Sequence, residues 1–464
     1  MKRACPRLRC SLLALPVVLL ASVALAQVNI NSSPNAVGSG ARALGMGGAF
    51  IAVADDATAA SWNPGGLTQL ERPELSIVYS WKYGEEDFDS ESHPELNGSH
   101  DVDFDSLNYL SFVYPFKHTI AGRNLVLSLN YQRKFDFDRA LDVYFHDITP
   151  LPFGFLFDLG TRVKYRQGGS LSAISPALGF ELTNRLSVGV VANIWDESLL
   201  PSNEWKERTE FKTRFSINGV IPSFVWGEIV EDYKDFEGTN YTFGLLYRPT
   251  QRLSVGAVYH TKFAADVKYT RYFRLRGGVP FFTSAYREED RRIEYPSAIG
   301  VGLAYRFPND KLTLSLDVTR REWDEFVEVD RTGRRTSPIT GLRKNVSFHE
   351  PTYTVRLGGE YVFVDANRPK QNYLPSLRAG LIYDPEPAGG RPDRWFGLGQ
   401  GDGETEKYYG VTLGAGVLIK NRVNIDAAYE YRWGDDVRKD SFSLFGTDAD
   451  VEQHQFYLST VVYF

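Results

Sequence analysis

Few side chains in this chain have the types and spacing of a catalytic or metal-binding site. The seven histidines are scattered and show no metal-ligand spacing. A phospholipase built on strands would need a serine and a histidine side by side; His260 falls in a predicted strand, but no partner serine can be identified. Both cysteines, Cys5 and Cys10, lie in the N-terminal leader, so the remaining chain has no thiol chemistry. We therefore expect no enzyme activity, no metal site and no cofactor.

Two further segments have compositions found in ion-binding sites. The glycines between Gly38 and Gly48 have the composition of a phosphate loop, but no strand precedes them and no Gly-Lys-Ser/Thr follows. Close backbone packing is the better interpretation. The acidic segment 85–105 could bind calcium, but its spacing matches no calcium-loop motif, and a solvated outer surface is favoured.

Residues 1–26 have the three parts of a secretory signal peptide. Four basic residues come first, an apolar run extends from Ser11 to Leu25, and Ala24-Leu25-Ala26 forms a cleavage site. Removing these cations makes the chain more acidic than the −6 of the full sequence. An acidic chain argues against a nucleic-acid partner.

The elements that would position any site are strands, because polarity alternates with a period of two. One example is the run from Val423 to Trp433, in which the odd-numbered positions are apolar or aromatic and Asp426, Glu430 and Arg432 lie between them. Such runs are about ten to fifteen residues long, which suits a tilted membrane strand better than a soluble sandwich. No apolar run after the leader is long enough for a membrane helix.

The runs predict an all-β fold, a 14-stranded antiparallel transmembrane β-barrel with alternating long outer loops and short periplasmic turns. Residues 205–217 could be a fifteenth strand, but the alternation of loop lengths favours a ribbon within the third long loop, because an even strand count needs fourteen. The polar faces of the strands predict a set of lumen-facing side chains: Asp317, Arg356, Glu360, Asp426, Glu430 and Arg432. The predicted strands are 73–84, 105–116, 123–136, 168–182, 185–197, 239–248, 252–269, 292–306, 310–325, 350–364, 373–384, 407–419, 421–434 and 451–464.

The segment before the first strand is rich in small residues and poor in strand formers. A barrel of this size encloses a lumen that side chains cannot fill. We therefore interpret residues 27–72 as an N-terminal hatch that plugs the barrel formed by residues 73–464. Pro64 ends any helix in this segment and pushes Asn63 toward extended geometry.

The sequence "GSGARALGMGGAFIAVADDATAASWNPGGL", from Gly38 to Leu67, resembles the hatch signature of the FadL/TodX family of outer-membrane transport proteins. The resemblance implies passive uptake of long-chain fatty acids or other hydrophobic compounds, with Asn63, Pro64 and Gly65 at the family's Asn-Pro-Ala triplet. The third strand, "NLVLSLNYQRKF", contains no Gly or Pro to form the kink through which the family releases ligands sideways. Lateral and periplasmic exit therefore both stay open.

Two outer loops carry apolar patches, "GVIPSFVW" and "GVPFF". Contiguous apolar residues on exposed loops need either burial or a ligand. They could pack on each other as a cap. The resemblance favours an outer hydrophobic groove, made from Ile221, Phe224, Val225, Trp226, Phe281 and Phe282.

The function predicted from the sequence is passive transport of a hydrophobic small molecule or fatty acid across a Gram-negative outer membrane. The expected partners are that ligand, the lipid of the membrane and the barrel-assembly machinery. The alternative is a PorV-like barrel of the same superfamily that docks a secretion partner.

Overall fold

The computed structural model describes the chain from Val37 to Phe464, and the predicted signal peptide lies outside the described residues. Within this range the described residues leave out 91–93, 121, 152–153, 201–202, 278–280, 309, 340–342, 366–370, 388–404 and 438–446.

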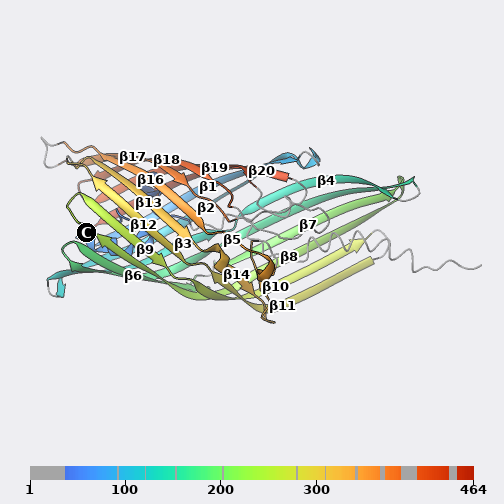
Figure 1. Cartoon of the computed structure of the whole chain (residues 1–464), viewed down its shortest axis with the longest axis horizontal. Coiled ribbons are helices and arrows are strands. Elements are labelled where there is room, and N and C mark those ends of the chain that lie inside the picture. The colour runs from blue at the N-terminus through green and yellow to red at the C-terminus, as the bar shows by residue number, and fades with distance from the viewer. Residues whose placement is uncertain are drawn as a thin grey trace, which may run out of the picture.

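Fourteen antiparallel strands close into a barrel, which confirms the predicted fold class (Figure 1). Each strand pairs with the next one in the ring, and β20 closes the ring by pairing with β1, for example Val462 with Leu75. The ring consists of β1 (Glu74–Ser90), β2 (Gly98–Ile120), β3 (Arg123–Asp136), β5 (Phe155–Thr183), β6 (Leu186–Asp196), β8 (Val220–Tyr247), β9 (Leu253–His260), β12 (Ala298–Arg306), β13 (Leu312–Arg321), β16 (Thr352–Val362), β17 (Tyr373–Tyr383), β18 (Tyr409–Ile419), β19 (Val423–Val437) and β20 (Thr447–Tyr463).

The period of two in the sequence matches the two faces of this wall. On β13, Leu314 and Leu316 are each 42% exposed, whereas Ser315 and Asp317 are each 2% exposed. The apolar face points outward because lipid replaces water there, and the polar face points into the lumen. The chain's many aromatic residues contribute to the outward face, as Tyr305 and Tyr361 do.

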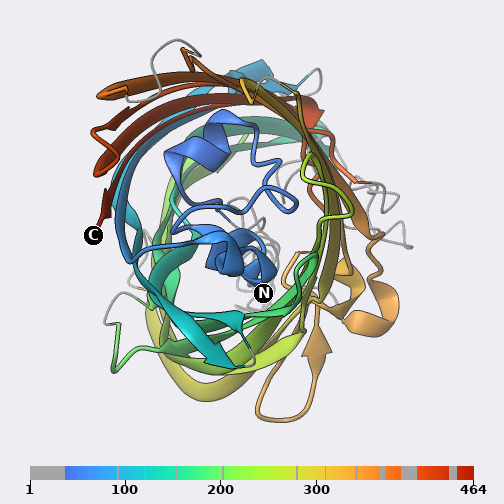
Figure 2. The same ribbon diagram turned by 90° about the vertical axis from the view of Figure 1, so that its left-hand side faces the viewer.

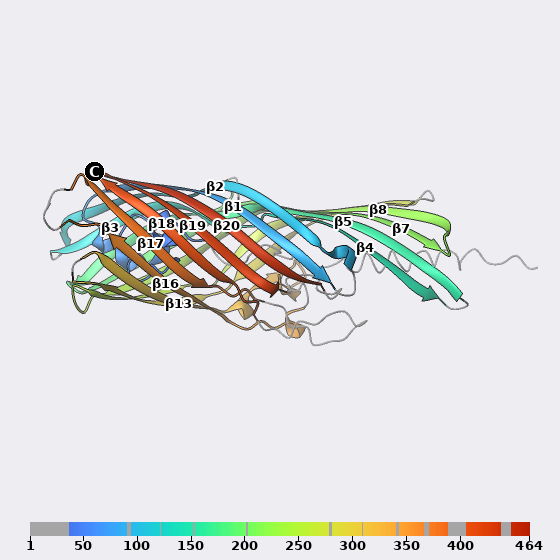
Figure 3. The ribbon, with the colours of Figure 1, turned by 90° about the horizontal axis from the view of Figure 1, so that it is seen from above.

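A second sheet continues outward from the barrel, on the side opposite the chain's C-terminus (Figures 1 and 3). The long strands β5 and β8 belong to both structures: their C-terminal halves lie in the barrel and their N-terminal halves in this outer sheet. The outer sheet has the order β4-β5-β7-β8-β10-β11-β14-β15, and its additional strands are β4 (Arg139–Leu151), β7 (Glu204–Ile217), β10 (Phe263–Gly277), β11 (Phe281–Tyr295), β14 (Val327–Val329) and β15 (Arg335–Thr336).

The outer sheet corrects the prediction in two respects. Segments 137–167, 198–238 and 270–291 are largely strand rather than loop, and the ribbon 205–217 is one of these strands, β7. The predicted strands 252–269 and 292–306 are each divided, because the chain leaves β9 at Thr261 to start β10, and Pro296 separates β11 from β12. Proline cannot donate to the strand ladder, which explains the second break.

Residues 37–72 fold into short helical segments that lie inside the barrel (Figure 2). These are α2 (Ala41–Gly45), α3 (Ala59–Trp62) and the 3-10 helix η1 (Pro64–Gln69). Asn63 adopts extended geometry and Pro64 begins η1, as the sequence predicts. Outside the hatch, the described residues contain the 3-10 helices η2 (Pro94–Leu96), η4 (Trp323–Glu325) and η5 (Lys344–Val346). No helix in the described part of the chain has the length and apolar character needed to cross a membrane.

Candidate binding site in the barrel lumen

Glycines on the inner wall allow the hatch backbone to touch the strands. A Cβ atom added at Gly302 would lie 2.9 Å from the Ala52 nitrogen, and one at Gly414 would lie 2.9 Å from the Gly45 Cα. Such distances are too short for real carbon contacts, so these positions need glycine. We call the set the glycine girdle; its members come from different strands and are Gly179, Gly189, Gly244, Gly256, Gly302, Gly358, Gly380 and Gly414.

Asn63, the first residue of the predicted hatch triplet, joins three segments. Its side-chain amide donates to the carbonyl oxygens of Ile51 at 2.8 Å and Leu245 at 3.0 Å, and its side-chain oxygen accepts from the Gly65 N–H at 3.0 Å. Leu245 belongs to β8, so this buried side chain links the turn at Pro64 to the wall. Pro64 and Gly65 pack against girdle glycines of β6 and β8.

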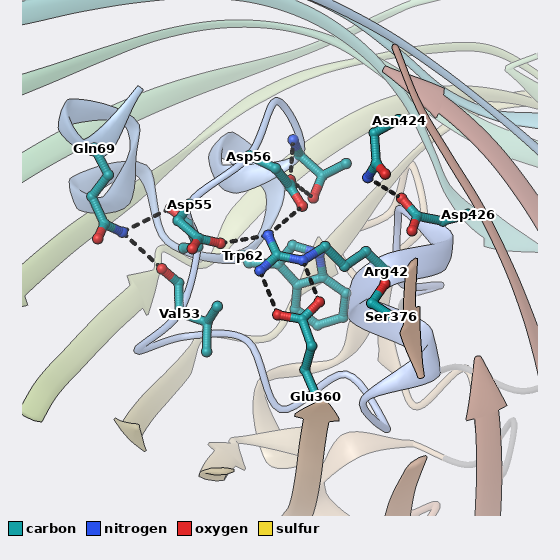
Figure 4. Close-up of polar contacts among 12 residues, drawn as sticks. Arg42, Val53, Asp55, Asp56, Trp62, Gln69, Glu360, Ser376, Asn424 and Asp426 are labelled. Atoms are coloured by element: carbon teal, nitrogen blue, oxygen red, sulfur yellow. Dashed lines mark hydrogen bonds and ion pairs between the residues drawn. The ribbon is translucent and has the colours of Figure 1, made fainter. Parts of the chain in front are cut away.

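An ion network joins α2 to the wall (Figure 4). Glu360 accepts from Arg42 of the hatch at 2.9 and 2.8 Å and from Arg378 of β17 at 2.8 Å. Arg378 also donates to Asp426 at 2.7 Å, and Arg42 reaches Asp55 within the hatch at 2.6 Å. Because every buried charge here has an opposite charge beside it, the network fixes α2 against β16 and β17.

The other four predicted lumen-facing side chains also lie on the inner side of the wall. Asp317 accepts from the Ile51 N–H of the hatch at 2.8 Å. Arg432 donates to Glu386 at 2.8 Å and lies over the Tyr408 ring, with 4.0 Å between the guanidinium carbon and the ring centroid. Glu430 is buried, and the Arg356 guanidinium lies 5.9 Å from the Trp62 ring centroid in the hatch.

A cavity of about 140 Å³ lies between the hatch and the outer end of the lumen. On one side it is lined by the aromatic residues Phe135, Trp195, Phe263 and Tyr295, in which Trp195 and Phe263 stack with 5.6 Å between ring centroids. Trp62 of the hatch also lines the cavity. The cavity therefore offers apolar, polarizable surface directly above the plug.

The same cavity is basic on its other side. Lys134, Arg321 and Arg356 line it, and within the described part of the chain none of the three has an ion pair with a carboxylate. Two carboxylates also line it, but Asp317 is bonded to the hatch backbone and Asp384 lies 3.5 Å from Arg432. The cavity is thus lined by more cations than carboxylates.

Of these three cations, only Arg356 was among the side chains predicted to face the lumen. Lys134 lies near the outer end of β3 and Arg321 at the end of β13, so each looks like an ordinary strand-end charge. His260, which the sequence raised as a catalytic candidate, also lines the cavity, where its Nδ1 lies 3.0 Å from the Thr242 hydroxyl. Lys134, Arg321 and His260 could have been predicted to face the lumen, because each falls on the polar face of its strand.

The six residues predicted for the outer groove lie on β8 and β11, which are separated by β10, and strand register divides those with described side chains between two faces. Val225 is buried in an apolar cluster with Phe211, Phe215 and Leu275 on the inner face of the outer sheet. Phe224 and Phe282 lie on the opposite face and are 56% and 64% exposed. Trp226 lies on the same face as Phe282, because both residues are paired in register with Arg276 of the intervening strand β10. The side chains of Ile221 and Phe281 fall outside the described residues.

The inner face of the outer sheet also carries a row of polar side chains, which lies between that apolar cluster and the barrel lumen. Glu207 of β7 is paired in register with Glu231 of β8, and the Gln167 amide donates to Glu207 at 3.1 Å. Burial, together with the neighbouring Glu231 carboxylate, raises the pKa of Glu207 well above its usual value. A rise in this direction favours the neutral acid.

Comparison with solved structures shows the same fold. The chain resembles a Pseudomonas aeruginosa FadL homologue with a TM-score of 0.57 and 14% identity, over 93% of this chain and 100% of that one. It resembles the Pseudomonas putida toluene transporter TodX with a TM-score of 0.56 and 14% identity, over 94% and 100%. The monoaromatic hydrocarbon channel CymD gives a TM-score of 0.53 and 15% identity, over 92% and 98%.

No curated protein matches the sequence. The family model of the outer membrane protein transport proteins (OMPP1/FadL/TodX) matches residues 167–459, which is more than half of the chain. That range begins in β5 and ends in β20, so it includes most of the barrel and of the cavity wall. The chain therefore belongs to the OMPP1/FadL/TodX family of outer-membrane transport proteins.

Proposed function

We propose that this barrel transports long-chain fatty acids, or similar hydrophobic carboxylates, passively across the outer membrane. The observation that carries the proposal is the lumen cavity, in which unpaired cations face an aromatic wall. A carboxylate would bind Lys134, Arg321 and Arg356, while the first part of an acyl chain would pack against Trp195 and its neighbours. Charge-assisted hydrogen bonds to a carboxylate are stronger than neutral ones, especially away from water.

The charge of the cavity distinguishes a fatty acid from a neutral hydrocarbon. A cavity of about 150 Å³ can hold one benzene ring, so the cavity volume alone would admit either a small aromatic compound or the head of an acid. A neutral ring would leave three half-buried cations without an ion pair, which costs free energy. The solved relatives named for toluene and monoaromatic hydrocarbons are similar in fold only.

The inner face of the outer sheet supports a route to this cavity. Its apolar cluster of Phe211, Phe215, Val225 and Leu275 lies on strands that continue toward the barrel. Burying apolar surface releases about 25 cal/mol per Å², so a chain can be captured there without an energy source. We propose that the hatch, residues 27–72, then limits passage through the barrel formed by residues 73–464, and that residues 1–26 are the export signal.

Head-group selection tests this proposal directly. Binding of oleate and oleyl alcohol to the purified protein in detergent is compared for the wild type and for Lys134→Met/Arg321→Met, which removes two charges but keeps side-chain length. We expect the wild type to bind oleate at least tenfold more tightly than the alcohol, and the variant to lose this preference while still binding the alcohol.

The matched control is Arg320→Met, because Arg320 is adjacent to Arg321 but more exposed and paired with Glu322 at 3.0 Å. It should keep the preference for oleate. Equal binding of acid and alcohol by the wild type would refute a carboxylate site. Uptake of labelled oleate by cells that lack their own transporter should follow the same order among the variants. The family match favours transport over the PorV-like docking alternative.

A further inference from the structure

The outward face of the outer sheet carries a row of basic and aromatic residues. Strand register places Arg162, Lys212, Trp226, Arg276 and Phe282 side by side on five successive strands, β5, β7, β8, β10 and β11. Neighbouring strands lie about 4.8 Å apart, so the row extends for roughly 20 Å across the sheet.

A second row lies one step closer to the tip of the sheet. Here Gly160, Arg214 and Phe224 are paired across β5, β7 and β8. On the edge strand β4, Tyr144 and His146 complete the two rows. Neither row contains a carboxylate, although the chain as a whole is acidic, with a formal charge of −6. We call these two rows the basic–aromatic face.

The charges on this face are largely uncompensated. Lys212, Arg214 and Arg276 are exposed, and in the part of the chain that the structure describes none of them forms an ion pair. Arg162 and His146 are the exceptions, because Arg162 binds Asp142 at 2.7 Å and the His146 Nε2 lies 2.9 Å from the Asp158 carboxylate. Unpaired cations of this kind, in one plane and several ångströms apart, form an electrostatic site for an extended polyanion.

The aromatic side chains lie among these cations. Phe224 is 56% exposed and Phe282 is 64% exposed, and each is next to an arginine in its row. The Arg274 guanidinium lies 4.7 Å from the Trp226 ring centroid and donates to Glu228 at 2.6 Å, so the indole is held in place. Rings fixed in this way offer flat apolar surface between the charges.

The face stands well clear of the membrane. β8 enters the barrel at Glu237, its first residue paired with β6, and Trp226 lies eleven residues before it. At about 3.3 Å per residue this is roughly 35 Å of strand. Because barrel strands tilt by about 35–45°, the face lies roughly 25–30 Å above the point where β8 joins the barrel. A polymer that extends from a cell surface can reach that height.

We propose that the basic–aromatic face binds an acidic polysaccharide. Carboxylate or phosphate groups along the polymer would bind Lys212, Arg214 and Arg276, and the C–H faces of its sugar rings would stack on Phe224, Trp226 and Phe282. This interaction holds the outer sheet within the carbohydrate layer of a cell surface. It is separate from transport, because the apolar cluster proposed for ligand capture lies on the opposite face of the same strands.

Binding of polygalacturonate, with neutral dextran of equal length as the comparison, tests the proposal. Purified protein in detergent is measured at 0.15 M salt, where charges farther apart than about 8 Å are screened. The wild type should bind polygalacturonate and not dextran. Lys212→Glu/Arg214→Glu/Arg276→Glu should weaken binding at least tenfold and should leave oleate binding unchanged.

The charge-matched control is Lys206→Glu/Lys234→Glu/Lys268→Glu. These lysines are also exposed on the outer sheet, but each lies within 4 Å of a carboxylate, at 3.3, 3.8 and 2.8 Å. The control should change polygalacturonate binding less than threefold, and heat-modifiable gel mobility verifies that each variant is folded.

Phe224→Ser/Phe282→Ser separates ring stacking from simple charge attraction. This variant should bind polygalacturonate at least threefold more weakly at unchanged charge. Three results would overturn the proposal: equal weakening by the two charge variants, wild-type binding by the Phe variant, or loss of oleate binding rather than polygalacturonate binding by the first charge variant. The last result would assign the face to the transported carboxylate.

Discussion

The glycine girdle makes a quantitative prediction for Gly358→Ala. A Cβ at this position would lie 2.9 Å from both the Met46 carbonyl carbon and the Met46 Cβ, and closer still to the Met46 carbonyl oxygen. Ordinary carbon contacts begin near 3.4 Å, so the α2 end of the hatch has to shift. Overpacking of this kind costs about 1–3 kcal/mol, which corresponds to a roughly 5- to 150-fold change in an equilibrium constant.

Because the strain falls on the hatch rather than on the strand ladder, we expect the barrel to stay folded and the hatch to detach more often. Cleavage after Arg42 by trypsin measures this, because Arg42 is held in the ion network unless the hatch opens. When opening is fast compared with cleavage, the cleavage rate follows the open population. Mass spectrometry of the digest should show a 5- to 150-fold faster cut after Arg42 in Gly358→Ala.

Gly359→Ala is the matched control, since Gly359 is the next residue of β16 but points outward. Its added Cβ would meet the Leu314 Cδ2 at 3.2 Å and the Thr313 oxygen at 3.9 Å, which a flexible leucine can accommodate. Cleavage in this variant should equal that of the wild type. If Gly358→Ala is also cleaved at the wild-type rate, the hatch has room against the wall and the argument for a tight fit is wrong.

Three shorter predictions concern the wall and the hatch. Leu314→Arg places a charge in lipid at a cost of about 2–4 kcal/mol near the midplane, so it should lower the yield of heat-modifiable barrel, while Leu314→Met should not; equal yields would refute the assigned outward face. Glu360→Gln removes the anion that Arg42 and Arg378 share and leaves them Asp55 and Asp426, so the cost should stay below the roughly 3–5 kcal/mol of a fully unpaired buried charge; trypsin should then cut after Arg42 faster, whereas the partly exposed Glu322→Gln should have no effect. Asn63→Ala removes the bonds to the backbone of the hatch and of β8, so hydrogen exchange in 63–69 should accelerate; unchanged exchange would show that the turn holds without them.

The sequence was sufficient for the barrel because membrane strands obey a strict local rule. Lipid on one side and a polar lumen on the other force an alternation that is visible over ten residues, as on β13 and β19. The outer sheet continues beyond the barrel wall. Its strands, such as β7 with four basic residues, alternate between charged and buried positions, and most of them fall in segments predicted as loops.

The partners of the lumen-facing side chains could not be predicted in the same way. Alternation placed Glu360 and Asp426 on the inner face. Their partners come from elsewhere in the fold: Arg42 lies in the hatch, far from Glu360 in sequence, and Arg378 lies on β17, whereas Asp426 lies on β19. The glycine girdle, in contrast, could have been predicted from the sequence. Gly189, Gly256 and Gly302 interrupt otherwise regular strands at inward positions, where a glycine commonly marks close approach of another backbone.

The interlocking of hatch and wall has a consequence for the order in which the protein is built. The hatch backbone fits into girdle positions on strands from β5 round to β18, and it is joined to β1 at the closing seam, where the Phe464 N–H donates to the Pro73 carbonyl oxygen at 3.0 Å. A plug shaped by contacts on so much of the circumference cannot be threaded into a finished cylinder. We therefore expect the contacts between hatch and wall to form before the β1–β20 seam closes, so that the strands assemble around the hatch.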